Sequence, residues 1–308
     1  MPRNKTGSCL FLYTSARDGI TATTMSSNTK SELDTKAYGS SFLDDLGPPI
    51  RRYPYKGTKQ FLETVEMELS RQEEEFEASE WVLFTKVNAQ TFRRDFLKSN
   101  GNILQRCWKS YDSSQHLLLV RVTVSRAHEI AAHVFERLFF KCLQPMGLDN
   151  RVHTFGSATC KAENGSAKQP DCQFLSKRLP RARTKKWPSV VVETGFSESP
   201  SKLMSDARFW LSESSGDVQM VITIKIGRSS PHIVLEAWER VNDRIQRQQV
   251  VTISKGENNH VYLRNQPFTI SFNKLFLRPP SIPKEKNISL DDDILKEIAE
   301  NVWEEQGF

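Results

Sequence analysis

Two stretches of the sequence decide the fold, KQPDCQFL at residues 168–175 and SVVVETGF at residues 189–196. Both contain apolar, β-rich runs of strand length, and the chain between them is long enough for the two strands to lie side by side. Asp171 stands at the start of the first strand, and Glu193 lies near the end of the second. We therefore expect two carboxylates at the ends of neighbouring strands.

These two carboxylates predict a metal site. An aspartate and a glutamate on adjacent strands can hold one divalent cation, and Mg²⁺ prefers hard oxygen ligands. We expect Mg²⁺ here, with Mn²⁺ as its substitute. The alternative is that Asp171 is a turn or cap residue, as an aspartate before a strand often is. Glu193 is harder to explain in this way, because it follows three valines and a buried unpaired charge is costly.

A metal held in this way can lower the pKa of a bound water and stabilise the leaving oxygen of a phosphodiester. Such chemistry also needs a lysine near the phosphate. Lys225 is the first candidate, because it lies in the strand-like run VITIKI and is costly to bury without a carboxylate partner. Lys202, in the helix expected after Glu193, is the second candidate, and its alternative role is that of an ordinary surface lysine.

The chain divides into three parts around these strands. Residues 1–57 are rich in Ser, Thr, Gly, Pro and Asn without lasting periodicity, which predicts a disordered arm. Residues 58–80 are expected to form an acidic helix, and the glutamates are concentrated at residues 62–80. Its acidic face is either solvated or a contact surface for a protein partner. Residues 81–308 are expected to form the main domain.

The main domain is predicted to mix helices and strands. Helices are expected at residues 89–97, 127–143 with Ser125 as the N-cap, 199–211, and from Ser289 onwards. Strands are expected at residues 116–124, 151–159, 171–175, 189–194, 218–226, 233–241, 249–254, 261–264 and 268–276. This order predicts an α/β fold with a mixed central sheet flanked by helices, an antiparallel strand extension and a C-terminal helix.

The positive charge is concentrated in one part of the chain. The net charge is +6, and residues 161–187 contain eight lysines and arginines against two acids. Within this stretch a basic segment at residues 177–186 predicts contact with nucleic-acid phosphates. Its alternative is a solvated loop between two strands, although its position between Asp171 and Glu193 favours phosphate contact. The candidate binding residues are Lys177, Arg178, Arg181, Arg183, Lys185 and Lys186.

Several classes of protein are excluded by the composition. No apolar run approaches the roughly 18 residues that a membrane span needs, so no membrane contact is expected. The longest N-terminal apolar stretch, residues 9–13, is too short for a signal peptide, which favours an intracellular protein of the nucleus or cytoplasm. The five cysteines include no CxxC pair, which argues against a disulfide framework and a structural zinc cluster.

The order of these motifs resembles the PD-(D/E)XK nuclease superfamily, which has the restriction endonuclease-like fold. Pro170-Asp171 matches the PD element, and Glu193 matches the acidic position of the second strand. Glu129, on the preceding helix, matches a glutamate that many members carry there. The wider pattern looks like a group of uncharacterised fungal proteins with this domain, and it includes HE at 128–129, GS at 156–157, KQPD at 168–171 and DARFWL at 206–211.

The resemblance, which covers roughly residues 90–280, implies a Mg²⁺-dependent nuclease that acts on DNA or RNA. Asp171 and Glu193 would hold the metal, and Glu129 would assist from the helix. The family places a lysine two residues after the glutamate, where this chain has Gly195, so Lys225 or Lys202 would replace it. The alternative function is a catalytically degenerate module of the same fold that binds nucleic acid or a protein partner.

Overall fold

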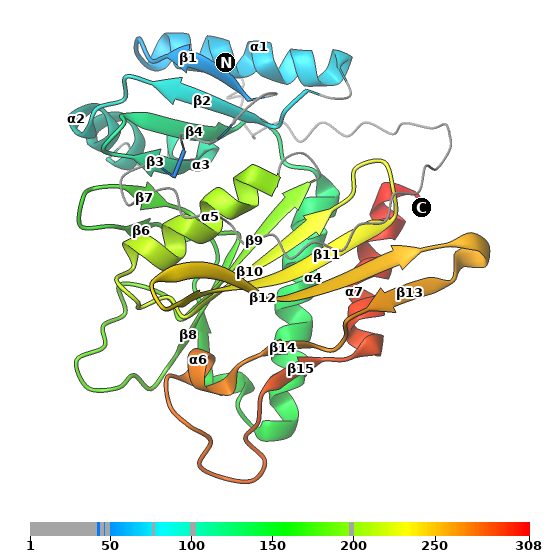
Figure 1. Cartoon of the computed structure of the whole chain (residues 1–308). Coiled ribbons are helices and arrows are strands. Elements are labelled where there is room, and N and C mark those ends of the chain that lie inside the picture. Colours follow the sequence, from blue (N-terminus) through cyan, green and yellow to red (C-terminus); the bar gives the residue numbers. More distant parts are fainter. Residues whose placement is uncertain (1–41, 44–45, 47–49, 76–77, 99–102, 197–199) are drawn as a thin grey trace, which may run out of the picture.

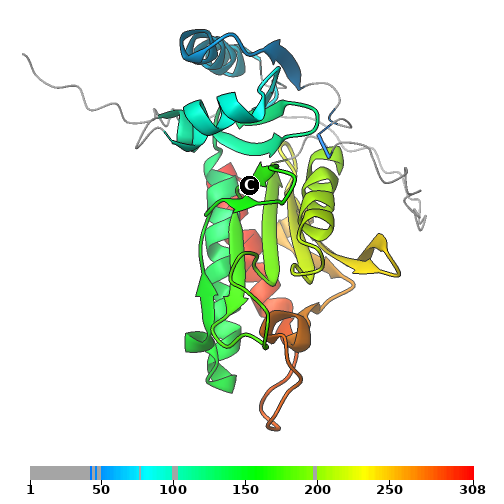
Figure 2. The same ribbon diagram turned by 90° about the vertical axis from the view of Figure 1, so that its left-hand side faces the viewer.

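The computed structural model describes residues 42–43, 46, 50–75, 78–98, 103–196 and 200–308. These residues form a six-stranded N-terminal sheet, a seven-stranded central sheet and a two-stranded ribbon. The N-terminal sheet lies across one end of the central sheet, and helices cover both faces of the central sheet (Figures 1 and 2). The predicted α/β class with a mixed central sheet flanked by helices is confirmed.

The central sheet has the strand order β13-β12-β11-β10-β9-β8-β5. Its strands β9 and β10 are parallel, and all its other pairs are antiparallel. This arrangement confirms that the two carboxylate-bearing stretches are neighbours and that the next strand runs parallel to the second of them. The strand bounds are β5 (Val152–Thr154), β8 (Cys172–Ser176), β9 (Val190–Phe196), β10 (Met220–Ile226), β11 (His232–Val241), β12 (Arg244–Lys255) and β13 (Val261–Arg264).

Helices α4 (Arg126–Leu143) and α7 (Asp292–Gln306) cover one face of the central sheet, and α5 (Pro200–Glu213) covers the other (Figure 2). The expected N-cap of α4 is present, because the Ser125 side chain accepts a hydrogen bond from the His128 amide. In β9, Val190 and Val192 pack in the same cluster as α4 and α7, whereas Val191 packs in the cluster that contains α5. A strand buried on both faces explains the uninterrupted run of valines.

The N-terminal sheet has the strand order β1-β2-β4-β3-β7-β6, and helix α1 (Thr58–Glu74) packs its buried Phe61 against it. Its strands are β1 (Arg51–Pro54), β2 (Trp81–Thr85), β3 (Trp108–Asp112), β4 (Leu117–Arg121), β6 (Cys160–Lys161) and β7 (Ala167–Lys168). Three short helical segments complete this region, namely α2 (Ala89–Thr91), the π-helix η1 (Phe92–Leu97) and α3 (Ile103–Cys107).

Strand β7 joins the two sheets. It pairs with β3 in the N-terminal sheet, and only three residues separate its end from the start of β8 in the central sheet. The KQPD stretch at residues 168–171 is therefore the crossing between the sheets. Lys168 and Asp171 lie at its two ends, so their relative position is set by both sheets together.

Some predicted boundaries need correction. The predicted arm extends too far, because Phe42, Leu43, Leu46 and Ile50 are buried and β1 pairs in parallel with β2. These apolar side chains pack in the cluster that includes α5, and backbone pairing gives β1 its place at the sheet edge. Residues 1–41 lie outside the described residues. The acidic helix predicted at residues 58–80 ends at Glu74. Within the rest of the predicted range, residues 76–77 lie outside the described residues.

The C-terminal region also differs in detail from the prediction. Residues 268–276 do not form one strand, because β14 (Phe268–Ile270) is followed at once by α6 (Phe272–Phe276). Strand β15 (Ile288–Leu290) pairs with β14, so the terminal helix begins only after Asp291, whose side chain accepts a hydrogen bond from the Ile294 amide. Short 3-10 helices are η2 (Gln144–Met146), η3 (Asp149–Arg151) and η4 (Glu257–Asn259).

The order of elements predicts that the strand at residues 116–124 belongs to the central sheet, and this prediction is wrong. The corresponding strand β4 lies in the N-terminal sheet, where it pairs with β2 and β3. Among the described residues, no helix combines the length and hydropathy that a membrane crossing requires. Cys142, Cys160 and Cys172 are free thiols.

Candidate functional site

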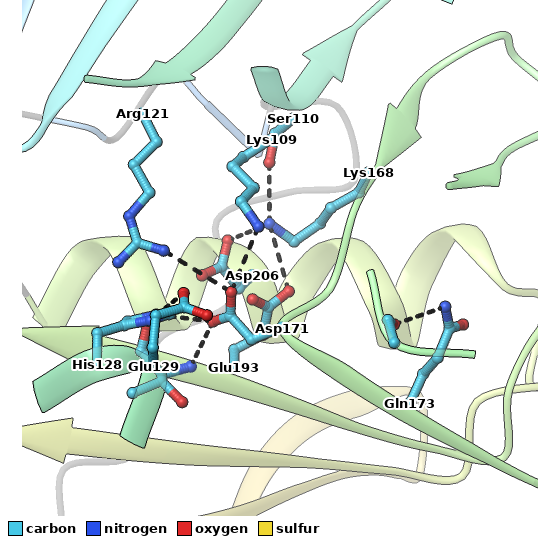
Figure 3. Close-up of polar contacts among 12 residues, drawn as sticks. Lys109, Ser110, Arg121, His128, Glu129, Lys168, Asp171, Gln173, Glu193 and Asp206 are labelled. Atoms are coloured by element: carbon cyan, nitrogen blue, oxygen red, sulfur yellow. Dashed lines mark hydrogen bonds and ion pairs between the residues drawn. The ribbon is translucent and has the colours of Figure 1, made fainter. Parts of the chain in front are cut away.

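A cluster of charged side chains lies where the N-terminal sheet meets the ends of β8 and β9 (Figure 3). Nearly all of it is buried, and it draws on both sheets and on helices α4 and α5. We call it the charge cluster. Its members are Glu80, Lys109, Arg121, His128, Glu129, Lys168, Asp171, Glu193, Lys202 and Asp206.

Asp171 is the carboxylate with the most cationic neighbours. Its Oδ2 atom accepts hydrogen bonds from the Thr194 amide at 2.8 Å and from Nε2 of His128 at 3.1 Å. Its Oδ1 atom lies 3.5 Å from Nζ of Lys109 and 3.9 Å from Nη1 of Arg121. Burial alone would raise the pKa of Asp171, but these cations and the histidine hydrogen bond hold that pKa well below its usual range. Asp171 is therefore ionised.

His128 links Asp171 to Glu129. Its Nε2 atom faces two acceptors, the Asp171 carboxylate and the Thr194 carbonyl oxygen at 3.0 Å, so this nitrogen carries a proton. Its Nδ1 atom lies 3.4 Å from Glu129. Burial and Arg121 oppose protonation, yet Asp171 and Glu129 raise the pKa of His128. The predicted residue Glu129 thus reaches the centre only through His128, and its own side chain is largely exposed.

Glu193 is the second carboxylate. Its Oε1 atom accepts a hydrogen bond of 2.6 Å from Nε1 of Trp210 and lies 3.5 Å from Nζ of Lys168. Burial raises the pKa of Glu193 to about 7; the charge of Lys168 lowers this pKa, and Asp206 and Asp171 raise it further. The two buried carboxylates therefore differ, because the pKa of Glu193 is raised and the pKa of Asp171 is lowered.

Lys168 is the lysine that the structure brings to the carboxylates. Its ammonium group lies 2.5 Å from Oδ1 of Asp206, donates to Ser110 Oγ at 2.9 Å, and faces Glu193. Burial would lower the pKa of Lys168, but Asp206 and Glu193 outweigh that effect and raise it. Lys168 is therefore a charged lysine enclosed between the two sheets.

Lys202, the second predicted lysine, is buried rather than on the surface. Its Nζ atom lies 2.5 Å from the other oxygen of Asp206, one helical turn along α5, and 4.3 Å from the centroid of the Trp81 ring. Burial lowers the pKa of Lys202, although Asp206 opposes this shift. Asp206 thus holds two lysines, and only Lys168 also approaches Glu193 within ion-pair distance in the described part of the chain.

Lys225, the first predicted lysine, lies beside Gly195 in the parallel β9–β10 pair, two positions beyond the pair of Thr223 with Glu193. Side chains two positions apart on a strand share a face, so Lys225 is on the same face as Glu193. Its amine has no hydrogen bond or ion pair among the residues that the structure describes. The pairing predicted for Lys225 is instead made by Lys168.

The basic segment at residues 177–186 lies at the other end of the β8–β9 hairpin. Asp171 precedes β8 and Glu193 is in the second half of β9, whereas the segment follows β8, so antiparallel pairing separates it from the carboxylates. The position of the segment between Asp171 and Glu193 in the sequence, which would favour phosphate contact, therefore does not bring it close to them. The guanidinium of Arg183 already has partners within the protein, because it donates to Asp217 and to the Trp187 carbonyl oxygen. Lys177, Arg178, Arg181, Lys185 and Lys186 are exposed.

The acidic helix α1 presents a solvated face, as predicted. Glu63, Glu66, Glu73 and Glu74 are exposed, whereas Glu68 is buried and bonded to Tyr53 and Arg71. Glu80, beyond the helix, is buried and pairs with Arg121. Contact between this helix and a protein partner stays a prediction.

The donor set of the two carboxylates is suited to a hard divalent cation. Oδ1 of Asp171 and Oε2 of Glu193 take part in no hydrogen bond among the described residues, although Oδ1 of Asp171 faces Lys109 and Arg121. No group of three or more His, Cys, Asp and Glu side chains in the described ranges is arranged to hold a metal. A metal held by Asp171 and Glu193 would have to complete its coordination with water and substrate oxygens, as Mg²⁺ commonly does.

Sequence reasoning missed Lys109, Arg121, His128, Lys168 and Asp206 as members of this centre. Lys168 lies inside the KQPD motif and Asp206 inside the DARFWL motif of helix α5, and a charged residue among apolar neighbours that are expected to be buried is a usable signal. Lys109 and Arg121 carry no such signal, because they come from strands of a sheet whose position over β8 and β9 depends on tertiary packing.

Comparison with known proteins identifies no family for this chain. No protein-family model matches it, and no curated protein matches it. Among solved structures, it is similar to a crystal structure of a candidate nuclease of the DUF820 family from Anabaena variabilis, with 13% sequence identity and a TM-score of 0.35. That match covers 63% of this chain and 90% of the other. The resemblance to fungal proteins stays a prediction.

Proposed function

We propose that this protein is a nuclease that hydrolyses phosphodiester bonds of DNA or RNA at Asp171, Glu193 and Lys168. The observation that supports this most strongly is the convergence of three groups. Two carboxylates on neighbouring strands each have one oxygen without a hydrogen bond among the described residues. The Lys168 ammonium lies 3.5 Å from the other oxygen of Glu193, Oε1. An Asp, a Glu and a Lys with these roles are what the resemblance to the PD-(D/E)XK superfamily implies.

Each residue has a role in the proposal. Asp171 and Glu193 would hold Mg²⁺ or Mn²⁺, which when bound supplies an acidified water and stabilises charge on a phosphate. Lys168 is placed to stabilise negative charge beside Glu193, and preorganised cations of this kind contribute strongly in a dry site. His128 orients Asp171 through the hydrogen bond at Oδ2, and Glu129 supports His128.

A second candidate function is a catalytically degenerate module that binds nucleic acid or a protein partner. Burial favours it, because the exposed fractions of the Lys168, Glu193 and Asp171 side chains are 1%, 4% and 8%. Each carboxylate also has a cationic neighbour already. Binding through the exposed cations of residues 177–186 would need none of these buried groups.

A cleavage assay separates the two functions. Labelled single- and double-stranded DNA and RNA are incubated with the full chain across a Mg²⁺ and Mn²⁺ titration, with EDTA as the blank. Metal-dependent cleavage is expected in the wild type and is expected to fall by about 100-fold or more in Asp171→Asn, Glu193→Gln and Lys168→Met. The matched control Lys284→Met removes an exposed lysine outside the basic segment and should cleave normally.

Three results would decide against parts of this proposal. Absence of metal-dependent cleavage on all four substrates, with circular dichroism showing a folded chain, would favour the binding module. Cleavage that survives Lys168→Met but is lost in Lys225→Met would identify Lys225 of β10, and not Lys168, as the catalytic lysine. Cleavage that survives Asp171→Asn and Glu193→Gln would place the reaction elsewhere in the molecule.

A further inference from the structure

Arg121 is buried in the charge cluster with part of its guanidinium unused. Its side chain is 2% exposed, and its Nη2 atom donates to Glu80 at 3.3 Å. Its Nε and Nη1 atoms have no hydrogen-bond partner in the described part of the chain. Buried polar groups are nearly always hydrogen-bonded, so such unused donors require an explanation.

Lys109 approaches the same place from the neighbouring strand β3. Its Nζ atom lies 3.5 Å from Oδ1 of Asp171, and Nη1 of Arg121 lies 3.9 Å from that oxygen (Figure 3). Neither contact is a hydrogen bond. The Lys109 side chain is 16% exposed, which makes it the most accessible of these three groups. Two cations with unused donors therefore converge on Oδ1 of Asp171.

We infer that Arg121 and Lys109 form a binding site for a phosphate group beside Asp171. This inference rests on the proposed function and assigns the phosphate to the nucleic-acid substrate. Both groups offer only N–H donors, and a phosphate offers several charged acceptor oxygens that can satisfy more than one of them. Arginine also binds phosphates well in partly dry sites, because its guanidinium is more weakly hydrated than an ammonium.

The site divides the work between the two sheets. The carboxylates come from β9 and from the residue just before β8 in the central sheet, and the N-terminal sheet supplies the phosphate-binding cations from β3 and β4. In the structure, Asp171 neutralises both cations and competes with an anion for them. Removing the charge of Asp171 should therefore strengthen phosphate binding, although the same change should abolish hydrolysis.

Isothermal titration calorimetry of inorganic phosphate into the full chain, in EDTA at low salt, tests this. Lys109→Gln should bind phosphate about tenfold more weakly or worse, since it loses a hydrogen bond to a charged group. Arg121→Lys keeps a positive partner for Glu80 and should weaken binding to a similar extent. Lys284→Gln, which replaces an exposed lysine outside the charge cluster and the basic segment, is the matched control and should bind within about twofold of the wild type. Asp171→Asn should bind several-fold more tightly.

The outcomes distinguish this site from the proposed function. Wild-type phosphate affinity in both Lys109→Gln and Arg121→Lys, or no phosphate binding at all, overturns the inference, while the cleavage assay still decides the reaction. Phosphate binding that depends on Lys109 in a chain that cleaves nothing would support the site and reject the nuclease. If Arg121→Lys fails to fold by circular dichroism, Lys109→Gln and Asp171→Asn decide, because their changes in affinity are expected in opposite directions.

Discussion

The two ends of the β8–β9 hairpin are both rich in positive charge, but they use it differently. At one end, Asp171 and Glu193 lie within the buried charge cluster beside Lys168. At the other end, six residues or about 20 Å along an extended strand from Asp171, the loop that begins at Lys177 exposes its cations to solvent. The sequence places all of these cations in one basic stretch.

The difference shows that the number of charges says little about their energetic role. A buried cation has a large desolvation cost that its carboxylate partners offset, so removing either member leaves an unpaired buried charge. An exposed cation is solvated by water and loses little when it is removed. Substitutions at the two ends should therefore differ greatly in effect, and four experiments test how far this contrast holds.

The largest effect is expected at Lys168. Lys168→Met should lower the free energy of unfolding by about 4 kcal/mol, because Glu193 loses its nearest cation and Asp206 loses one of two. Lys177→Met, its counterpart at the exposed end, should change that free energy by less than about 0.5 kcal/mol. Urea unfolding of both variants measures the difference, and equal values would remove the contrast between the ends.

Glu193 predicts a dependence of stability on pH. Its pKa is raised to about 7 in the folded chain from 4.5, so the folded state binds its proton more tightly than the unfolded state. The stabilisation that this proton provides is therefore present below pH 4.5 and is lost as the pH rises to about 7, by up to about 3 kcal/mol.

Glu193→Gln cannot titrate at this position and should remove that loss. His128, whose pKa is also raised, contributes in the same direction in both proteins, so the difference between them isolates Glu193. Urea unfolding at about pH 5 and about pH 8 measures it. The same decline with pH in wild type and variant would mean that Glu193 keeps an ordinary pKa.

Arg183 is the residue of the exposed end that is expected to matter for stability. It belongs to the basic segment by sequence, but its guanidinium donates to Asp217 at 2.9 Å and to the Trp187 carbonyl oxygen at 2.8 Å. Arg183→Gln should lower the free energy of unfolding by about 2 kcal/mol, since hydrogen bonds from a charged donor are removed. Arg181→Gln, two residues away and exposed, is the control and should be close to neutral.

The smallest effect on stability is expected from the exposed cations themselves. Replacing Lys177, Arg178, Arg181 and Lys185 together by Gln should leave the free energy of unfolding within about 0.5 kcal/mol of the wild-type value. If these side chains bind nucleic-acid phosphates, the slope of log affinity against log salt should flatten by about 0.9 for each phosphate of duplex DNA that the variant no longer neutralises. An unchanged slope, measured by fluorescence anisotropy, would leave the segment as a solvated loop.

The sequence predicted the elements with clear local patterns. Periodicity and capping rules predicted helix α4 with its Ser125 cap, the valine-rich strand β9 and the crossover through α5 to β10. In these elements the local pattern of apolar residues indicates which side chains are buried. The expectation that Asp171 and Glu193 lie on neighbouring strands followed from the same patterns. The short strands β6 and β7 were missed, since two residues carry no period.

The lysine shows why the rest of the site could not be predicted. Lys225 has the better sequence argument, because it lies in an apolar strand beside the one that carries Glu193. Lys168 has the better position, because β7 pairs with β3 and this pairing turns its side chain towards Asp206 and Glu193. Pairing between strands that are far apart in the chain leaves no trace in local composition, and Lys109 and Arg121 were missed for the same reason.

The crossing at residues 168–171 also bears on the order of folding. The cluster joins groups that are far apart in the chain, for example Lys168 with Ser110, separated by 58 residues, and Arg121 with Glu80, separated by 41. Contacts of such high sequence separation form slowly, because the entropy cost of loop closure comes before they contribute. We therefore expect the centre to be completed late, only after both sheets have formed and docked, so that incompletely folded chains lack it altogether.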